Sequence, residues 1–171
     1  LIPSLLAASD VLGTGWYAAH SAEVRHGSTV VVLGAGPVGL MGVLAAGEMR
    51  AGRIIAMSRH KSRQDLALEY GATDIVAARG DEGIAKIKQL TNQIGADAVL
   101  ECVGTAESME KALAVARPGS MIGYVGVPHG VQFDGQQLFF TQAGMLGGPA
   151  PVRRFLPHLL DLMLSRKINP G

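Results

Sequence analysis

The sequence predicts an α/β fold in which a doubly wound, six-stranded parallel sheet carries helices on both faces. Short apolar runs alternate with amphipathic segments of helical length along most of the 171-residue chain. Short connections between such segments favour parallel strands joined by right-handed crossovers. The composition, 48% hydrophobic and only 17% charged, fits strands that are covered on both faces. One compact domain over residues 1–171 is therefore expected.

The first half of the chain predicts one strand-helix-strand unit behind a leading helix. That leading helix is expected from Gly15 to Val24. Residues 29–33 are a β-branched run between glycines, which is typical of a buried strand. A helix should begin near Pro37, because proline in the first turn loses no hydrogen bond. A strand over 53–57 and a helix over 61–71 follow, with Gly71 as the helix stop.

The second half repeats the alternation with weaker boundaries. Helices are expected over 81–94 and after the N-cap Thr105, where Pro118 and Gly119 end the helix. A final helix over 151–167 should bury one apolar face. A loop containing Asp134 precedes the last strand. The strands of this half are expected at 74–76, 97–103, 120–127 and, more weakly, 144–147.

Composition excludes several classes of protein. The balance of 15 basic and 14 acidic residues gives a net charge of +1, which argues against nucleic-acid and anionic-membrane partners. Residues 27–47 carry no charge, but glycines and Pro37 interrupt them, so they predict strand, turn and helix instead of a membrane span. The single cysteine, Cys102, excludes an intrachain disulfide and predicts a cytoplasmic location.

A glycine motif follows the first strand directly and opens the first long helix. Gly34 permits a tight turn, Gly36 lets a pyrophosphate approach the backbone, and Gly39 allows close packing of helix on strand. Pro37 and Val38 would place their backbone at the helix N-terminus, which attracts phosphate. The alternative is a glycine turn needed only for packing. The context favours a dinucleotide site.

The residues after the second strand predict which dinucleotide is bound. An NAD site places an acid there to hold the ribose 2′-hydroxyl, but this chain has Ser58 followed by a basic cluster without an acid before Asp65. A 2′-phosphate would meet cations and a hydroxyl there, so we expect NADP(H) in preference to NAD(H). The alternative is a solvated basic helix start. The predicted phosphate ligands are Ser58, Arg59, His60 and Arg63.

S-adenosylmethionine or FAD could occupy the same glycine pattern, so further motifs are needed. The segments ASDVLGTG, GAGPVGLM, EYGATDIV, ECVG, RPGSMIGYVGVP and MLGG occur in this order. Together they resemble the coenzyme-binding (Rossmann) domain of zinc-dependent medium-chain alcohol dehydrogenases. The resemblance covers nearly the whole chain.

The resemblance implies a partner domain outside this sequence. In that family a catalytic domain supplies most zinc ligands and the proton relay, and residues 1–14 would be the linker from it. Asp10 matches a ligand position before the Thr-Gly pair, although without the resemblance it would be interpreted as a helix N-cap. The chain starts without Met, so we expect a fragment. Alone it should bind the dinucleotide without oxidising alcohols.

The resemblance also implies how the nicotinamide would be held. Thr14 would lie beside the ring as the one catalytic residue of this chain. Backbone groups of three residues at turns or strand ends of the carboxyl edge would bind the carboxamide; they are Val125, Gly144 and Leu146. Val103 and Gly104 would line the cleft, and Cys102 beside them is interpreted as a small buried hydrophobe.

The expected activity is hydride transfer between an alcohol and the nicotinamide, with an alcohol, aldehyde or ketone as substrate and Zn²⁺ in the full-length enzyme. A zinc-independent quinone reductase relative and a non-catalytic dinucleotide-binding module are the alternatives. The histidines show no metal-ligand spacing. A homo-oligomer, dimer or tetramer, is expected through the edge strand, with residues 138–140 as a candidate contact.

Overall fold

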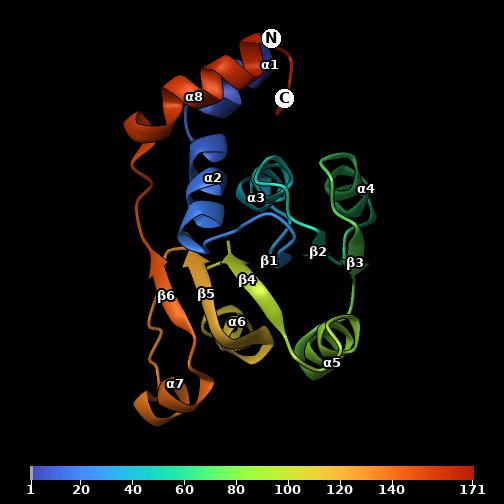
Figure 1. The fold of residues 1–171 in the computed structure, drawn as a ribbon, viewed down its shortest axis with the longest axis vertical. Helices are drawn as coiled ribbons and strands as arrows, with labels where there is room; N and C mark the ends of the chain where they lie inside the picture. The colour runs from blue at the N-terminus through green and yellow to red at the C-terminus, as the bar shows by residue number, and fades with distance from the viewer. Residues whose placement is uncertain (1) are drawn as a thin grey trace.

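The computed structural model describes residues 2–171, and the predicted six-stranded parallel sheet is confirmed. The strand order is β3-β2-β1-β4-β5-β6, and each neighbouring pair is parallel (Figure 1). The strands are β1 (Thr29–Leu33), β2 (Arg53–Met57), β3 (Asp74–Val76), β4 (Ala96–Glu101), β5 (Ala116–Tyr124) and β6 (Gly144–Gly147). The chain reverses its strand order between β1 and β4, which is where ligands bind in this architecture.

Eight helices connect and flank the strands in residues 2–171. They are α1 (Ile2–Ala8), α2 (Val11–Ser21), α3 (Pro37–Glu48), α4 (Lys61–Glu69), α5 (Gly80–Leu90), α6 (Ala106–Val115), α7 (Gly135–Thr141) and α8 (Val152–Leu164). In Figure 1, α2, α3 and α4 lie above the sheet and α5, α6 and α7 lie below it. The sheet is therefore covered on both faces.

Two apolar cores form because the residues of one strand alternate between the faces. Val30 and Val32 pack under α2 and α3, whereas Val31 and Leu33 pack against the α5 and α6 side. All four side chains are almost fully buried. This double burial explains why β1 is uninterruptedly apolar.

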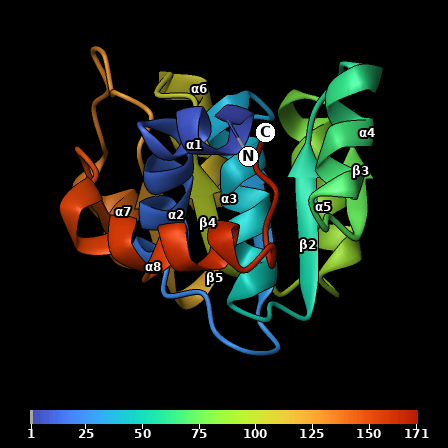
Figure 2. The same cartoon turned by 90° about the horizontal axis from the view of Figure 1, so that it is seen from above.

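The two ends of the chain meet where α1 packs against α8. Ser4 Oγ donates a hydrogen bond of 2.8 Å to Asn169 Oδ1. Figure 2 shows the N- and C-termini side by side above α3. The apolar face predicted for α8 is confirmed, because Phe155, Leu159, Leu162 and Met163 are all buried.

Three element boundaries differ from those predicted. Helix α5 ends at Leu90, so Ile94 lies outside it and is 60% exposed; Asn92 and Gln93 adopt left-handed backbone conformations, which end the helix. Strand β4 ends at Glu101, which leaves Cys102 and Val103 in a loop. Strand β5 starts early, at Ala116, and a register shift against β4 accommodates Pro118 and Gly119.

The sequence analysis missed two helices and misplaced the start of a third. Residues 1–14 were expected to be a linker, but residues 2–8 form α1, and α2 begins at Val11. The loop expected around Asp134 is the start of α7, where the Asp134 carboxylate accepts hydrogen bonds from the N–H groups of Gln136 and Gln137. Within residues 2–171, every helix is too short or too polar to cross a membrane.

Candidate cofactor site

A cavity of about 570 Å³ opens at the carboxyl ends of β1, β2, β3 and β4. This volume is typical of a small-molecule or cofactor site. The cavity brings together seven of the predicted cofactor-binding residues: Gly34, Gly36, Ser58, Arg59, His60, Arg63 and Val103. These seven residues therefore line one cavity, and their role in binding a cofactor stays a prediction.

The three glycines of the loop have different structural roles: one adopts a left-handed conformation, one allows close packing, and one leaves room for a ligand. Gly34 has φ +92°, a left-handed conformation that favours glycine. A Cβ on Gly39 would lie 1.8 Å from the Gly34 carbonyl oxygen, so helix and strand touch through backbone. A Cβ on Gly36 would meet nothing within 4 Å, because this residue faces the cavity. The physical roles predicted for these three glycines are consistent with this geometry.

The start of α3 points free backbone donors at the cavity. Gly36 is the N-cap and has no side chain to cap the first turn, and Pro37 stands at the first helical positions. The N–H groups of Val38 and Gly39 therefore belong to the part of a helix that lacks internal partners. Such an N-terminus is a ready site for phosphate.

The turn after β2 presents the polar wall of the cavity. The Ser58 N–H donates to the Val76 carbonyl at 3.1 Å, and Gln64 Nε2 donates to the Ser58 carbonyl at 2.7 Å. These bonds hold the turn against β3 and α4. Arg59 Nε donates to His60 Nε2 at 3.2 Å, so the two basic side chains lie together. The two neighbouring basic side chains make this wall of the cavity a candidate binding site for a ribose phosphate.

Acidic groups near the cavity are already paired with cations. Lys61 forms an ion pair with Asp65 one turn along α4, and Lys111 Nζ lies 3.3 Å from Glu107 Oε1 on α6. Within residues 2–171, Arg59, Arg63 and Arg79 make no ion pair. The cavity therefore holds three cations without an ion-pair partner within residues 2–171, which favours an anionic ligand.

The wall after β4 is made of backbone and small side chains. Cys102, Val103, Thr105 and Ser108 line it. Burial and the adjacent Glu101 raise the pKa of the Cys102 thiol, which favours the protonated form. The side chain is partly buried, because it lines the cavity. The predicted N-cap at Thr105 is confirmed, because its Oγ1 accepts a 3.2 Å bond from the Ser108 N–H.

The residues proposed for the nicotinamide lie outside this cavity. Val125 directly follows β5 at the carboxyl edge, and its N–H donates to the Glu101 carbonyl at 2.9 Å, while its own carbonyl accepts no hydrogen bond within residues 2–171. Leu146 lies near the end of β6. The expected carboxyl-edge position of Gly144 is wrong: it begins β6, pairs with Met121, and so lies toward the opposite edge. Gly104 is buried where the loops after β4 and β5 pack together, outside the cavity lining.

Asp10 and Thr14 lie together at the start of α2. Thr14 Oγ1 donates to the Asp10 carbonyl at 3.0 Å and lies 3.3 Å from Asp10 Oδ1. Asp10 is the N-cap residue of α2, as the alternative interpretation expected, but its side chain makes no capping hydrogen bond. Within residues 2–171 no three His, Cys, Asp or Glu side chains gather as metal ligands. The Asp10 carboxylate is exposed and accepts a hydrogen bond from Thr14.

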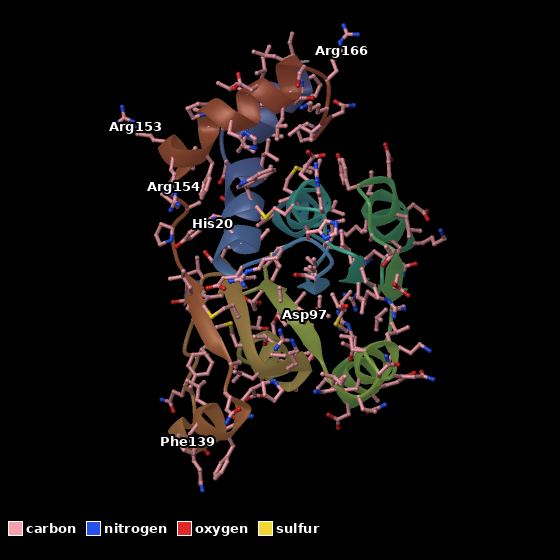
Figure 3. The ribbon with its side chains drawn as sticks, viewed as in Figure 1. His20, Asp97, Phe139, Arg153, Arg154 and Arg166 are labelled. Atoms are coloured by element: carbon pink, nitrogen blue, oxygen red, sulfur yellow. The ribbon has the colours of Figure 1, made fainter. Side chains whose placement is uncertain are left out.

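Sequence reasoning missed several residues of the cavity. Arg79 ends the loop after β3 at the start of α5, and Glu107 and Lys111 project from α6. Position after a predicted parallel strand was the available signal for Arg79. Arg153 and Arg154 project outward from α8 and do not line the cavity (Figure 3).

Comparison with known proteins identifies the family. The model for the zinc-binding dehydrogenase family matches residues 37–165, which is most of the chain. The chain therefore belongs to the zinc-binding dehydrogenase family, and the resemblance found in the sequence is confirmed.

Individual relatives agree with this assignment. The chain is 35% identical to the NADP-dependent isopropanol dehydrogenase of Thermoanaerobacter brockii over 95% of this chain and 48% of the relative. It is 34% identical to zinc-type alcohol dehydrogenase B of Aspergillus flavus over 98% of this chain and 41% of the relative. The chain thus spans about half, or less, of the curated relatives it matches.

Solved structures show the same fold. Alcohol dehydrogenase TADH from a Thermus species aligns with a TM-score of 0.90 and 31% identity over 98% of this chain and 49% of that one. A zinc-binding dehydrogenase from Sinorhizobium meliloti bound to NADP aligns with a TM-score of 0.81 and 26% identity over 94% and 48%. Neither the quinone reductase alternative nor the non-catalytic module gains support.

Proposed function

We propose that this chain is the NADP(H)-binding domain of a zinc-dependent alcohol dehydrogenase that transfers hydride between an alcohol and the nicotinamide. The observation that carries the proposal is the cavity at the carboxyl edge, which joins a glycine loop to three cations that form no ion pair within residues 2–171. Relatives named as NADP-dependent isopropanol dehydrogenases support it. An alcohol, aldehyde or ketone is the corresponding small-molecule substrate.

The dinucleotide would be held by the residues of the cavity. The pyrophosphate would lie over Gly36 and accept hydrogen bonds from the first turn of α3. Arg59, His60 and Arg63 would hold the 2′-phosphate, with Ser58 as a hydroxyl donor. No carboxylate stands at the strand end to repel that phosphate. This chain would therefore bind and orient the cofactor.

The nicotinamide would lie toward Val103, Val125 and Leu146, with Thr14 beside the ring. The Val125 carbonyl supports this, because it accepts no hydrogen bond within residues 2–171. Zn²⁺, in the whole enzyme, would polarise the alcohol oxygen. The described residues of this chain do not compose a zinc site, so Asp10 would contribute one ligand to a site completed by a second domain.

A two-domain enzyme would explain both the length and the chain ends. The relatives are about twice as long as the matched region, and Ser4 and Asn169 hold the two ends together. Adjacent ends are typical of domains inserted into another chain segment. Residues 1–171 would then be the coenzyme domain, residues 1–14 would lead into it, and we expect no alcohol oxidation by this chain alone.

A paired titration tests the cofactor assignment. Energy transfer from Trp16, the only tryptophan, to the reduced nicotinamide would report binding of NADPH and of NADH. We expect NADPH to bind at least about tenfold more tightly, a difference of about 1.4 kcal/mol. Arg59→Glu should lower NADPH affinity by about 10- to 100-fold, because it places like charges together, and should leave NADH within about threefold.

Arg153→Glu is the matched control, since it makes the same charge change on an arginine that points away from the cavity (Figure 3). It should leave both affinities unchanged. Equal binding of the two cofactors, or tighter binding of NADH, would overturn the NADP(H) assignment. Absence of any binding by the folded chain would overturn the assignment of the site.

Two further parts of the proposal concern the whole protein. Strand β6 has one neighbour in the sheet, and Phe139 and Phe140 on α7 are 75% and 70% exposed (Figure 3). Such an edge and apolar patch support a homo-oligomer, dimer or tetramer, which Phe139→Asp should dissociate in sedimentation equilibrium.

The single, partly buried thiol of Cys102 is consistent with a cytoplasmic location.

A further inference from the structure

One fully buried carboxylate near the site has no role in the function proposed so far. Glu101 is the last residue of β4 and has no exposed surface. Its Oε1 accepts three hydrogen bonds, from the Val103 N–H at 2.9 Å, the Gly104 N–H at 2.9 Å and Ser108 Oγ at 2.7 Å. Its Oε2 has no hydrogen-bond partner within residues 2–171. Burying a carboxylate with one oxygen unpartnered costs folding free energy, so the position of Glu101 calls for a functional explanation.

The bonds of Glu101 tie three segments of the carboxyl edge together. Oε1 fixes the loop after β4 and, through Ser108, the first turn of α6. The Glu101 carbonyl accepts from the N–H groups of Val125 and Gly126 at 2.9 and 3.3 Å, which fixes the turn after β5. One residue therefore determines how both loops emerge from the sheet.

The two loops also touch directly, and only glycine permits the contact. A Cβ on Gly126 would lie 2.2 Å from the Gly104 nitrogen and 2.7 Å from Glu101 Oε2. A Cβ on Gly104 would lie 2.4 Å from the Val127 carbonyl oxygen. The loops are thus packed backbone to backbone over the carboxylate. Displacing the carboxylate would move both of them.

We propose that Glu101 is a positioning residue for the nicotinamide half of the cofactor, acting through Val103 and Val125. This inference rests on the proposed function, because both residues stand where that cofactor half would lie. Val103 lines the cavity from the loop that Glu101 holds. Val125 is held at the carboxyl edge by the bond from its N–H to the Glu101 carbonyl, and its own carbonyl accepts no hydrogen bond within residues 2–171. The adenosine half would instead be held by the turn after β2.

A purely structural role makes a different prediction, and a fragment of the cofactor separates the two. None of the Glu101 hydrogen bonds involves Arg59, Ser58 or any other residue of the turn after β2. Adenosine 2′,5′-bisphosphate would place its phosphates on that turn and on the glycine loop, and it lacks the nicotinamide half that would reach Val125. A positioning residue should affect NADPH and spare the fragment. A structural residue should affect both ligands together or neither.

The test measures both dissociation constants by calorimetry on the folded chain. Glu101→Leu removes every acceptor and should weaken NADPH by about tenfold or more, because buried donors lose their partners, while the fragment stays within about twofold. Glu101→Gln keeps one acceptor oxygen and should recover most of the loss. Ser108→Ala removes one donor, should weaken NADPH by about two- to fivefold, and decides the question if Glu101→Leu does not fold.

Asp97→Asn is the matched control, because it alters a carboxylate on the same strand at the opposite edge of the sheet. It should leave the ratio of the two dissociation constants unchanged. A parallel loss of both ligands in the Glu101 and Ser108 variants, or no loss of either, would overturn the inference. Failure of the unmodified chain to bind NADPH would instead refute the proposed function.

Discussion

The two edges of the sheet differ in whether their charged side chains are paired within the protein. At the amino edge two ion pairs join neighbouring strands: Arg53 Nε and Nη2 lie 2.8 and 2.7 Å from the two Asp74 carboxylate oxygens, and Arg117 Nε lies 2.6 Å from Asp97. At the carboxyl edge, Arg59, Arg63 and Arg79 have no ion-pair partner within residues 2–171. The arginines at the strand starts are therefore paired within the protein, whereas the arginines of the cavity are not.

The contrast separates groups that hold the fold from groups that await a ligand. The pairs of the amino edge join β2 to β3 and β4 to β5 within the first two residues of each strand, so they support strand register. The hydrogen bond from Arg53 lowers the pKa of Asp74, which marks this carboxylate as bound in the folded state. Changes at the amino edge should therefore alter stability without altering cofactor affinity, and charge changes in the cavity should do the reverse.

The largest expected effect distinguishes two glycines of the same loop. Gly39→Ala would place a Cβ 1.8 Å from the Gly34 carbonyl oxygen, so α3 must move off β1. We expect the free energy of unfolding to fall by about 3 kcal/mol or more, as measured by urea denaturation. Gly36→Ala meets no atom within 4 Å and should change stability by less than about 1 kcal/mol.

Gly36→Ala should nevertheless abolish detectable NADPH binding, because its methyl group would occupy the approach of the pyrophosphate. The pair thus divides one motif into a packing position and a ligand position. Equal loss of stability in the two variants would contradict this division. Full NADPH affinity in Gly36→Ala would show that the phosphates lie elsewhere.

The next effect concerns the acid sensitivity of the amino edge. Burial opposes ionisation of Asp97, but the Thr29 N–H and Arg117 outweigh it and lower its pKa. A lowered folded-state pKa contributes stability that is present above the unfolded value, about 3.9, and is lost as the pH falls through the folded value. Asp97→Asn should therefore reduce stability by about 1 kcal/mol at pH 7, a modest amount because the pair is partly exposed.

The same variant should show a smaller loss of stability than the unmodified chain between pH 5 and pH 2, since its side chain no longer titrates. Urea denaturation across that range would measure the difference. Asp65→Asn, at an exposed pair on α4, is the control and should change stability by less than about 0.5 kcal/mol. Identical acid profiles for Asp97→Asn and the unmodified chain would contradict the role assigned to the amino edge.

The sequence predicted the fold well where the hydrophobic pattern was strong, and poorly where it was weak. The buried strands were placed well because Val30 to Leu33 and Ile54 to Met57 are unbroken apolar runs. Helix α7 was missed because its seven residues bury nothing fully and its cap, Asp134, sits in a typical turn sequence. The end of α5 was misplaced because Ile94 continued the apolar pattern although the backbone had already turned.

The site was predicted where it depends on side chains next to a motif, and not where it depends on backbone contacts across the sheet. Arg59 and Arg63 follow the second strand and could be found by position. Glu101 could not, because its role arises from loops more than twenty residues apart that meet in space. Gly144 was misplaced for a different reason. The family resemblance was taken to put this residue at the carboxyl end of a strand, but it is the first residue of β6.

The smallest expected effect belongs to Arg79, the cavity cation that the sequence did not reveal. It is exposed and approaches the cavity from the loop after β3, opposite Arg59, so its attraction to a 2′-phosphate would be partly screened by solvent. Arg79→Ala should weaken NADPH by about threefold, leave NADH unchanged, and leave the free energy of unfolding within about 0.5 kcal/mol. Calorimetric titration at low salt should show the loss, and the same titration at high salt should reduce it. An equal loss for NADH would place Arg79 against the pyrophosphate, and a loss independent of salt would remove it from the set of cations that distinguish this edge from the other.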